Sequence, residues 1–465
     1  MKIFLNDLGV LKIADFEIGD LTIICGKNNT GKTYAVYAFY GFLKLWRQFI
    51  KITFDTRHID LLMKQGSTKI DLQKISKNVG VAIQNGCQGY SNSLHKVFAS
   101  RPERFLGSQF RLEIAESAIR LDRAFEKNFK SSTKDLIRFW KKSNETTLEI
   151  FWLQEGEQKT ISVQAMQGMI NDALLDLFLS PVLPSVFMAS AERTGAAIFL
   201  RELDFARNRL LEQMGNMGKD LDVFELMKKA YNYYPFPVTD NVDFTRDFES
   251  IVKNDSFLVE KHPDLLADFH ALIGGEYRVV SSELYFVPQK NRASRLTMNE
   301  SSSAVRSLLS IGLYLRHLAQ PGEMLMVDEP EINLHPENQR LLARLFVRLV
   351  NCGIKVFVTT HSDYLIKELN TLIMMNHLEE SLRVLVMTKH GYHRDELLSV
   401  DQIRVYNAGP ALTLLPGNSK RSRVNTFTAA DVSAMLGIEV KDFDESILKM
   451  NRIQEEILEF GVDLA

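Results

Sequence analysis

The sequence predicts an α/β fold with a mixed central sheet, an antiparallel N-terminal lobe and a largely helical insertion. Three observations lead to this class. An apolar run at 21–25 leads into a glycine-rich loop and then into a helix-forming segment. Apolar runs at 324–327 and 356–359 read as buried strands, with a helical pattern between them. Short strand-like runs separated by Asn-Asp and Gly-Asp turn signals fill the first 25 residues.

The other elements follow from local apolar patterns. Helical spacing is found at 31–50, 115–129, 170–180, 196–272 (with a break at 231–237), 305–318 and 336–349. Strand-like runs are found at 3–5, 10–18, 111–114, 146–153, 159–163, 186–188, 277–280, 284–287 and 382–387. A last helix, spaced by Ile447, Met450, Ile453, Ile457 and Phe460, is expected to pack on the rest of the fold. Residues 51–100 show a mixed pattern.

The composition is that of an ordinary globular protein. The 465 residues, 45% hydrophobic and 25% charged, allow about two to four domains. The net charge is -2, so no global basic excess indicates nucleic acid. Cys25, Cys87 and Cys352 lack zinc spacing and read as reduced core thiols. No apolar run approaches the ~20 residues of a membrane span, and no secretory signal is visible. We therefore expect a cytoplasmic protein without a membrane partner.

The glycine-rich loop at 26–33 reads Gly-Lys-Asn-Asn-Thr-Gly-Lys-Thr and matches every fixed position of the P-loop motif. The strand before it and the helix after it supply the context that this motif requires. Backbone N–H groups of such a loop surround nucleotide phosphates at a helix N-terminus. Lys32 is expected between the outer phosphates, and the Thr33 hydroxyl on Mg²⁺. The predicted nucleotide-binding residues here are Gly26, Asn28, Asn29, Thr30, Gly31, Lys32 and Thr33.

An acidic pair ends the strand at 324–327, in the form of a Walker B element. Asp328 is predicted to hold the Mg²⁺ shell, and Glu329 to act as the general base on the attacking water. His361 follows the strand at 356–359 and is predicted to reach the terminal phosphate and to hold Glu329. The catalytic residues are thus expected to be Lys32, Glu329 and His361. The ordinary alternatives are an acidic surface turn and a histidine with a structural partner.

Ser302 lies in a serine-rich stretch just before the helix at 305–318. Serine commonly caps a helix, and an exposed capped N-terminus is also a phosphate site. We expect this one to serve the nucleotide of a second subunit. Arg193 follows the strand at 186–188, and the sequence leaves open whether it is structural or senses the phosphates. The basic clusters at 290–295 and 420–423 read more simply as solvated loops than as nucleic-acid contacts.

These motifs, in this order, resemble the ABC-type ATPases of the SMC, RecF and OLD (AAA15-like) branch. They are the P-loop, the serine-rich helix start, Val-Asp-Glu-Pro-Glu at 327–331, Asn-Leu-His-Pro at 333–336 and Thr-Thr-His-Ser-Asp at 359–363. The sequence looks most similar to ATPase components of anti-phage systems such as Septu and PARIS. The resemblance implies an ABC-type P-loop ATPase head that uses ATP and Mg²⁺. It also implies a homo-oligomer, at least a dimer, in which Ser302 and Ser303 cross to the partner's nucleotide.

Two departures from the family pattern affect the predicted site. The family signature usually has glycine after its serines, whereas this chain has Ala304, which predicts a weaker or rearranged contact across the dimer. The lid glutamine of the family has only one candidate here, Gln289.

The resemblance also predicts four parts of the chain. Residues 1–50 form the N-terminal lobe of the head, and 51–275 form the insertion, of which about 100–190 returns to the head. Residues 276–375 carry the signature, Walker B and histidine motifs, and 376–465 pack on the head. The 296 positions between Lys32 and Asp328 (328 − 32) are typical of a head split by an insertion.

OLD proteins carry a metal-dependent nuclease after the ATPase, but this chain is expected to have none. Only 104 residues follow His361 (465 − 361), and the strand at 382–387 ends without a carboxylate. Asp442 and Asp444 have suitable spacing but follow a poor strand at 437–441. The resemblance therefore predicts a sensor ATPase of antiviral defence that regulates a separate effector, such as a nuclease or toxin. The alternative is a RecF- or SMC-like DNA-repair ATPase, which leaves nucleic acid open as a partner. The long insertion argues against a transporter motor.

Overall fold

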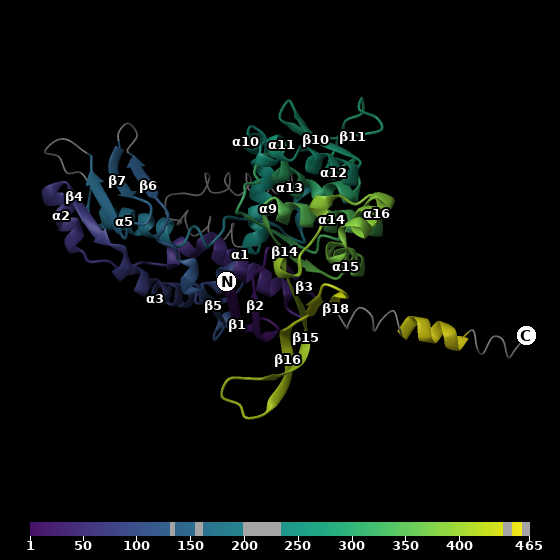
Figure 1. Ribbon diagram of the computed structural model, residues 1–465, viewed down its shortest axis with the longest axis horizontal. Helices are drawn as coiled ribbons and strands as arrows, with labels where there is room; N and C mark the ends of the chain where they lie inside the picture. Colours follow the sequence, from purple (N-terminus) through teal and green to yellow (C-terminus); the bar gives the residue numbers. More distant parts are fainter. Residues whose placement is uncertain (131–134, 154–160, 199–233, 440–448, 458–465) are drawn as a thin grey trace, which may run out of the picture.

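The computed structural model describes residues 1–130, 135–153, 161–198, 234–439 and 449–457 (Figure 1). A six-stranded sheet lies at its centre and confirms the predicted mixed α/β fold. In spatial order its strands are β16 (Arg421–Ala429), β15 (Ile403–Leu414), β3 (Leu21–Cys25), β14 (Lys355–Thr360), β13 (Met324–Asp328) and β9 (Val186–Ala189). The last five run parallel, and β16 closes one edge in the antiparallel direction.

Smaller antiparallel sheets surround this centre. The N-terminal sheet contains β2 (Leu11–Glu17), β1 (Lys2–Leu8) and β5 (Gln109–Glu113). A second contains β4 (Ser67–Asp71), β8 (Thr147–Trp152), β7 (Asp135–Lys141) and β6 (Phe125–Lys130). A third contains β10 (Gly275–Val280), β11 (Glu283–Pro288) and β12 (Leu296–Thr297), and β17 (Asp431–Ser433) pairs with β18 (Gly437–Glu439). The insertion therefore contributes strands as well as helices.

The helices fall into two groups along the chain. The first contains α1 (Lys32–Phe49), α2 (Arg57–Gln65), α3 (Leu72–Ser91), α4 (Leu94–Val97), α5 (Val163–Phe178) and α6 (Arg193–Ile198). The second contains α9 (Phe236–Arg246), α10 (Phe248–Ile251), α11 (Phe257–Lys261), α12 (Pro263–Ile273), α13 (Ser303–His317), α14 (Pro336–Asn351), α15 (Asp363–His377) and α16 (Glu380–His390). None of the described helices is long and apolar enough to cross a bilayer.

Alternating residues of the buried strands separate two hydrophobic cores. Met324 and Met326 of β13 face a core that includes α1, α3 and α5. Leu325 and Val327 face the other core, which includes α13, α14 and α15. Side chains of a strand alternate between the two faces of its sheet, so the central sheet is covered by helices on both faces. This explains why every residue of β3 and β13 is buried and why both strands are mostly apolar.

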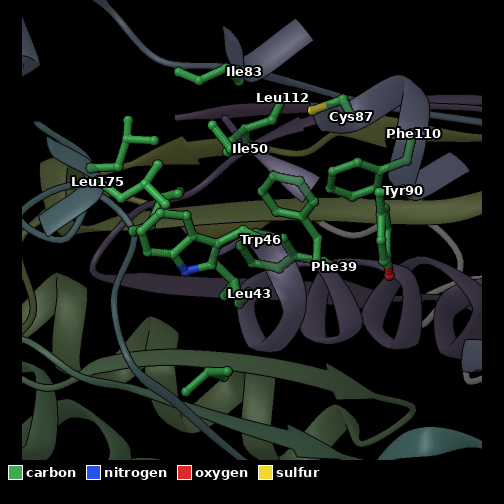
Figure 2. Close-up of a cluster of buried hydrophobic side chains, with 14 of the residues drawn as sticks. Phe39, Leu43, Trp46, Ile50, Ile83, Cys87, Tyr90, Phe110, Leu112 and Leu175 are labelled. Carbon is green, nitrogen blue, oxygen red and sulfur yellow. The ribbon is translucent and has the colours of Figure 1, made fainter. Parts of the chain in front are cut away.

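The first core extends from α1 into the insertion (Figure 2). Trp46 of α1 lies beside Leu175 of α5, while the ring of Phe110 in β5 meets the ring of Tyr90 in α3 edge-on. Tyr90 donates its hydroxyl to the main-chain oxygen of Ala38, at 2.6 Å. The helix that begins at the P-loop is therefore held by elements from residues 72–178.

Two predicted elements are wrong in type. Residues 115–129 do not form a helix, because alternate exposure along β6 places its two phenylalanines on one face of a strand. Positions 125 and 129 satisfy helical spacing and strand alternation equally, so the spacing misled the prediction. Residues 382–387 lie in α16 rather than in a strand, and Gly391 ends this helix in the left-handed conformation, with φ 68°. The three aliphatic side chains Leu382, Val384 and Leu385 stay exposed on it.

Other expectations are only partly confirmed. Residues 449–457 are helical, but every one of them is exposed, so this part of the last helix does not pack on the head as expected. Val163, expected at the end of a strand, begins α5. Residues 437–439 do form a strand, although a short one. Residues 154–160, Asp442 and Asp444 lie outside the described part of the chain.

Phe16 contacts four elements of the first core, and its replacement by alanine should be costly. Its ring is 1% exposed and lies 5.7–6.4 Å from the rings of Phe39, Phe357, Tyr406 and Phe427. We expect Phe16→Ala to lower the free energy of unfolding by about 3–5 kcal/mol, measured by urea denaturation. Val10→Ala, at an exposed site, should change it by less than about 0.5 kcal/mol. Equal losses in the two variants would contradict this description of the core.

Candidate active site

The P-loop connects β3 to α1 through a backbone that needs glycine. Gly26 has φ 136°, and a Cβ there would lie 2.3 Å from the main-chain oxygen of Ala408 in β15. Gly31 has φ 101°, and a Cβ there would meet the side chain of Leu11 at 2.4 Å. Side chains other than glycine rarely adopt these angles. The loop is therefore fixed between β15 and the N-terminal sheet.

Lys32 is buried inside this loop. Its ammonium donates to the main-chain oxygens of Gly26 and Lys27, at 3.0 and 2.9 Å. Burial lowers the pKa of Lys32, and the nearby charges of Glu329 and Asp328 oppose that effect. The amine thus lies between the loop backbone and the acidic side chains at the end of β13. This is where the positive charge of a P-loop lysine acts on phosphates.

The register of the central sheet brings the predicted motifs to one edge. Asp328 of β13 pairs with Thr359 of β14, and Thr360 pairs with Cys25 of β3. Because these strands are parallel, the residues that follow them emerge at the same edge. The P-loop, Asp328 and the segment that contains His361 therefore meet there.

Asp328 has the features of a cation ligand. Its side chain is 1% exposed, and Thr359 donates its hydroxyl to Oδ1. Within the described part of the chain, Oδ2 is buried without a hydrogen-bond partner. Burial raises the pKa of Asp328 to about 6. A carboxylate oxygen left unpaired in this way suits Mg²⁺, which binds through one or two protein oxygens and substrate phosphates. Asp328 and the hydroxyl of Thr33, in the first turn of α1, would hold this ion.

Glu329 and His361 form a pair beside Asp328. His361 Nε2 lies 3.2 Å from Glu329 Oε1, and this hydrogen bond lowers the pKa of Glu329. The main-chain N–H of His361 donates to Glu331 Oε1 at 2.5 Å, so the histidine is held from two directions. Glu329 has φ 51°, in the left-handed region, and its N–H donates to the main-chain oxygen of Thr359 at 3.1 Å. An ionised, oriented carboxylate of this kind can accept a proton from water.

The hydrogen bonds of Arg193 give it a structural role rather than a role in phosphate binding. It is 3% exposed and donates to four main-chain oxygens, those of Ser190, Ser307, Asp328 and Glu329. Burial lowers its pKa to about 10. The question that the sequence left open is therefore answered by geometry: Arg193 binds the backbone that carries the acidic pair.

The signature serines are not part of the cluster at the end of β13, which contains Lys32, Asp328, Glu329 and His361. Ser302 accepts the N–H of Val305 at 3.3 Å and so caps α13. Ser302 and Ser303 are exposed, and no hydrogen bond among the described residues joins them to Lys32 or Asp328. Gln289 follows β11, outside the central sheet, where its N–H donates to Gly274. The structure thus gives it no place at this edge.

Three contributors to the site were not predicted from the sequence. Thr359 binds Asp328, Glu331 binds His361, and Glu192 accepts the hydroxyl of Tyr37 at 2.9 Å. Thr359 and Glu331 belong to motifs that were recognised, so their position beside the strand ends was the available signal. Glu192 lies just beyond β9, and only the pairing of β9 with β13 places it near Asp328.

A comparison with known protein families supports an ATPase. Residues 207–366 match the family model of the AAA ATPase domain called AAA_15, a range that includes the signature, Walker B and histidine motifs. No curated protein matches the sequence.

Similar solved structures are heads of SMC proteins. One is an SMC head domain from Thermotoga maritima, at 12% identity and TM-score 0.29, covering 93% of this chain and 98% of that one. Another is an Smc head bound to the C-winged helix domain of ScpA, at 12% identity and TM-score 0.35, covering 91% and 97%. A third, an Smc head with an extended coiled coil bound to the C-terminal domain of ScpA and derived from Pyrococcus furiosus, has 12% identity and TM-score 0.32, covering 98% of each. At scores this low, the fold class rests on the strand order described above.

The match to AAA_15 covers residues 207–366 and, together with the site, supports a P-loop ATPase. The SMC- and RecF-like branch stays a prediction. The likeness to OLD proteins and to anti-phage systems stays a prediction.

Asp328→Asn should stabilise the nucleotide-free protein at alkaline pH. The pKa of Asp328 rises from 3.8 to about 6 on folding, so the native state binds more protons between these values and loses stability as the pH rises through them. Asparagine keeps an acceptor for Thr359 and removes the buried charge. We expect a gain of up to about 3 kcal/mol at pH 8, falling to none below about pH 4, in urea denaturation with chelator present. A variant less stable than wild type at pH 8 would contradict the assigned burial.

Proposed function

We propose that this chain binds and hydrolyses MgATP at a site shared between two copies of itself. The observation that carries the proposal is the convergence of Lys32, Asp328, Glu329 and His361 at one edge of the central sheet. A P-loop lysine, an unpaired buried carboxylate and an oriented glutamate are the groups that phosphoryl transfer to water requires.

Each of these residues has a separate task in the proposed reaction. The N–H groups at the start of α1 and the Lys32 ammonium bind the phosphate oxygens. Asp328 and Thr33 would hold Mg²⁺, which would supply positive charge to the phosphates. Glu329 accepts a proton from the attacking water, and His361 holds the Glu329 carboxylate in position. Catalysis then consists mainly of positioning and charge stabilisation.

A second copy would complete the site. Ser302 and Ser303 begin α13 on an exposed surface, and the N-terminus of this 15-residue helix is a place where an anion can bind. No hydrogen bond among the described residues joins these serines to Lys32 of their own chain. We therefore place them against the triphosphate of another copy, with ATP joining the two. Ala304 occupies the second helical position and limits how closely the helix backbone approaches.

We further propose that this ATP-dependent assembly holds or releases a separate effector protein in antiviral defence in the cytoplasm. The support for this role is the sequence resemblance and the exposed apolar side chains of the C-terminal part, which include Leu385, Met435 and Leu436. A DNA-repair role has one observation in its favour. Residues 402–430, which include the β15–β16 hairpin, contain four basic residues and no acidic one.

Glu329→Gln should separate nucleotide binding from hydrolysis. We expect turnover to fall by about 10²–10⁴-fold, because the proton acceptor is lost, while ATP still binds and assembled oligomers accumulate. Lys32→Ala should lose nucleotide binding instead. Steady-state phosphate release, titration with a fluorescent ATP analogue and light scattering measure these effects. Normal turnover by Glu329→Gln would rule out its role as the base.

Mixing two inactive variants tests whether the site is shared. Lys32→Ala removes the P-loop function. Ser303→Arg blocks the exposed start of α13, which we place against the triphosphate of the other copy. A mixed dimer keeps one intact site, so an equal mixture should recover up to about a quarter of the wild-type rate. Each variant alone is the control. No recovery, although the two variants assemble, would contradict a composite site.

Copurification and DNA dependence distinguish the two biological roles. A regulator should copurify with a discrete protein partner whose binding changes when Glu329→Gln is loaded with ATP. A repair ATPase should instead show turnover that DNA stimulates and that declines steeply with salt. Under the favoured role, duplex DNA leaves the rate unchanged. Strong stimulation by DNA, lost when Arg421 and Arg423 are changed to serine, would support the alternative.

A further inference from the structure

Helix α6, which follows β9, begins with a buried arginine that the reaction described above does not use. Arg193 donates from Nε to Ser307 at 2.7 Å, from Nη1 to Ser190 and Asp328 at 2.9 and 2.8 Å, and from Nη2 to Glu329 at 2.9 Å. These acceptors lie on three separate segments: the turn after β9, the end of β13 and the first turns of α13. One guanidinium thus joins the acidic pair to the helix that begins at the signature serines.

All four acceptors are main-chain oxygens. A guanidinium often binds carboxylates in a bidentate manner, but none of the hydrogen bonds described for Arg193 goes to the Asp328 or Glu329 side chain. Those carboxylates stay available to a cation and to water. Arg193 therefore places positive charge beneath the acidic pair without competing for its oxygens.

Glu329 depends on such support because its backbone is in an unfavourable conformation. Its φ of 51° is uncommon for a residue other than glycine, and such a strained conformation persists only where the surrounding structure imposes it. The N–H of Glu329 is held by Thr359 and its carbonyl by Arg193. These two bonds hold the backbone from which the Glu329 side chain extends toward His361.

We propose that Arg193 is a positioning residue that holds Glu329 in its hydrolytic orientation and links it to α13. This rests on the proposed function, in which α13 meets the nucleotide of a second copy. When Ser302 and Ser303 contact the second copy, any shift of α13 would change the position of Glu329 in the same chain. The link is Arg193, which is hydrogen-bonded to Ser307 of α13 and to Glu329. Release of α13 would loosen the carbonyl of Glu329 and slow hydrolysis in an unpaired copy.

Lysine and methionine at position 193 test this role. Lysine keeps the charge but lacks the planar fork that reaches three segments, and methionine lacks both. We expect Arg193→Lys to lower kcat by at least about tenfold, since small displacements of a catalytic group are costly. The KM and the affinity for a fluorescent ATP analogue should stay within about twofold. Arg193→Met should lose more, and if it does not fold, the lysine variant alone carries the test.

A double-mutant cycle with Glu329→Gln separates positioning from general stability. If Arg193 acts through Glu329, Arg193→Lys should reduce kcat little or not at all once Glu329 is already glutamine. Arg348→Lys is the matched control, because Arg348 is also 3% exposed but binds Asp264, Asp268 and Asp395 away from the site. It should lower the melting temperature while the kcat of the folded protein is kept.

The outcomes distinguish this inference from the function on which it rests. Equal losses from Arg193→Lys in the wild-type and Glu329→Gln backgrounds would overturn the positioning role and leave the proposed ATPase intact. A loss of nucleotide affinity that matches the loss of kcat would also overturn it. Full turnover by Glu329→Gln alone would overturn the positioning role together with the assignment of Glu329 as the base.

Discussion

The parallel register of three adjacent strands is the constraint on which the site depends. Pairing Asp328 with Thr359, and Thr360 with Cys25, brings segments that are some 300 residues apart to one edge of one sheet. The two hydrophobic cores hold this register, because a shift by one residue would exchange the side chains that face each core. The chemistry of the site is therefore a consequence of how the central sheet is packed.

Charge burial determines the electrostatics of the same edge. Asp328, Lys32 and Arg193 are each less than 5% exposed, and burying ionised groups without partners is costly. Here the costs offset one another, since two cations and an acidic group are buried close to one another. The hydrogen bonds of both cations go to main-chain oxygens, which leaves carboxylate oxygens for Mg²⁺ and water. The site is thus arranged for a ligand that brings both negative and positive charge.

The sequence predicted the parts of this site that have local signatures. The P-loop, the acidic pair and His361 each follow a strongly apolar strand, and such strands are recognisable without tertiary information. The sequence did not predict that β15 lies beside β3, because that pairing joins distant segments and Ala408 carries no motif. It misassigned 115–129 and 382–387 because short apolar runs fit either period. The task of Arg193 was undecidable, since its acceptors are backbone atoms that no residue type reveals.

The central claim is that one triphosphate is bound by the P-loop of one copy and by the start of α13 of another. The most direct measurement is an experimental structure of the Glu329→Gln protein with MgATP. The account predicts phosphates against residues 26–33, Mg²⁺ at Thr33 and Asp328, and Ser302 or Ser303 of a second copy at the terminal phosphate. A nucleotide enclosed by a single chain, or bound away from Asp328, would contradict it.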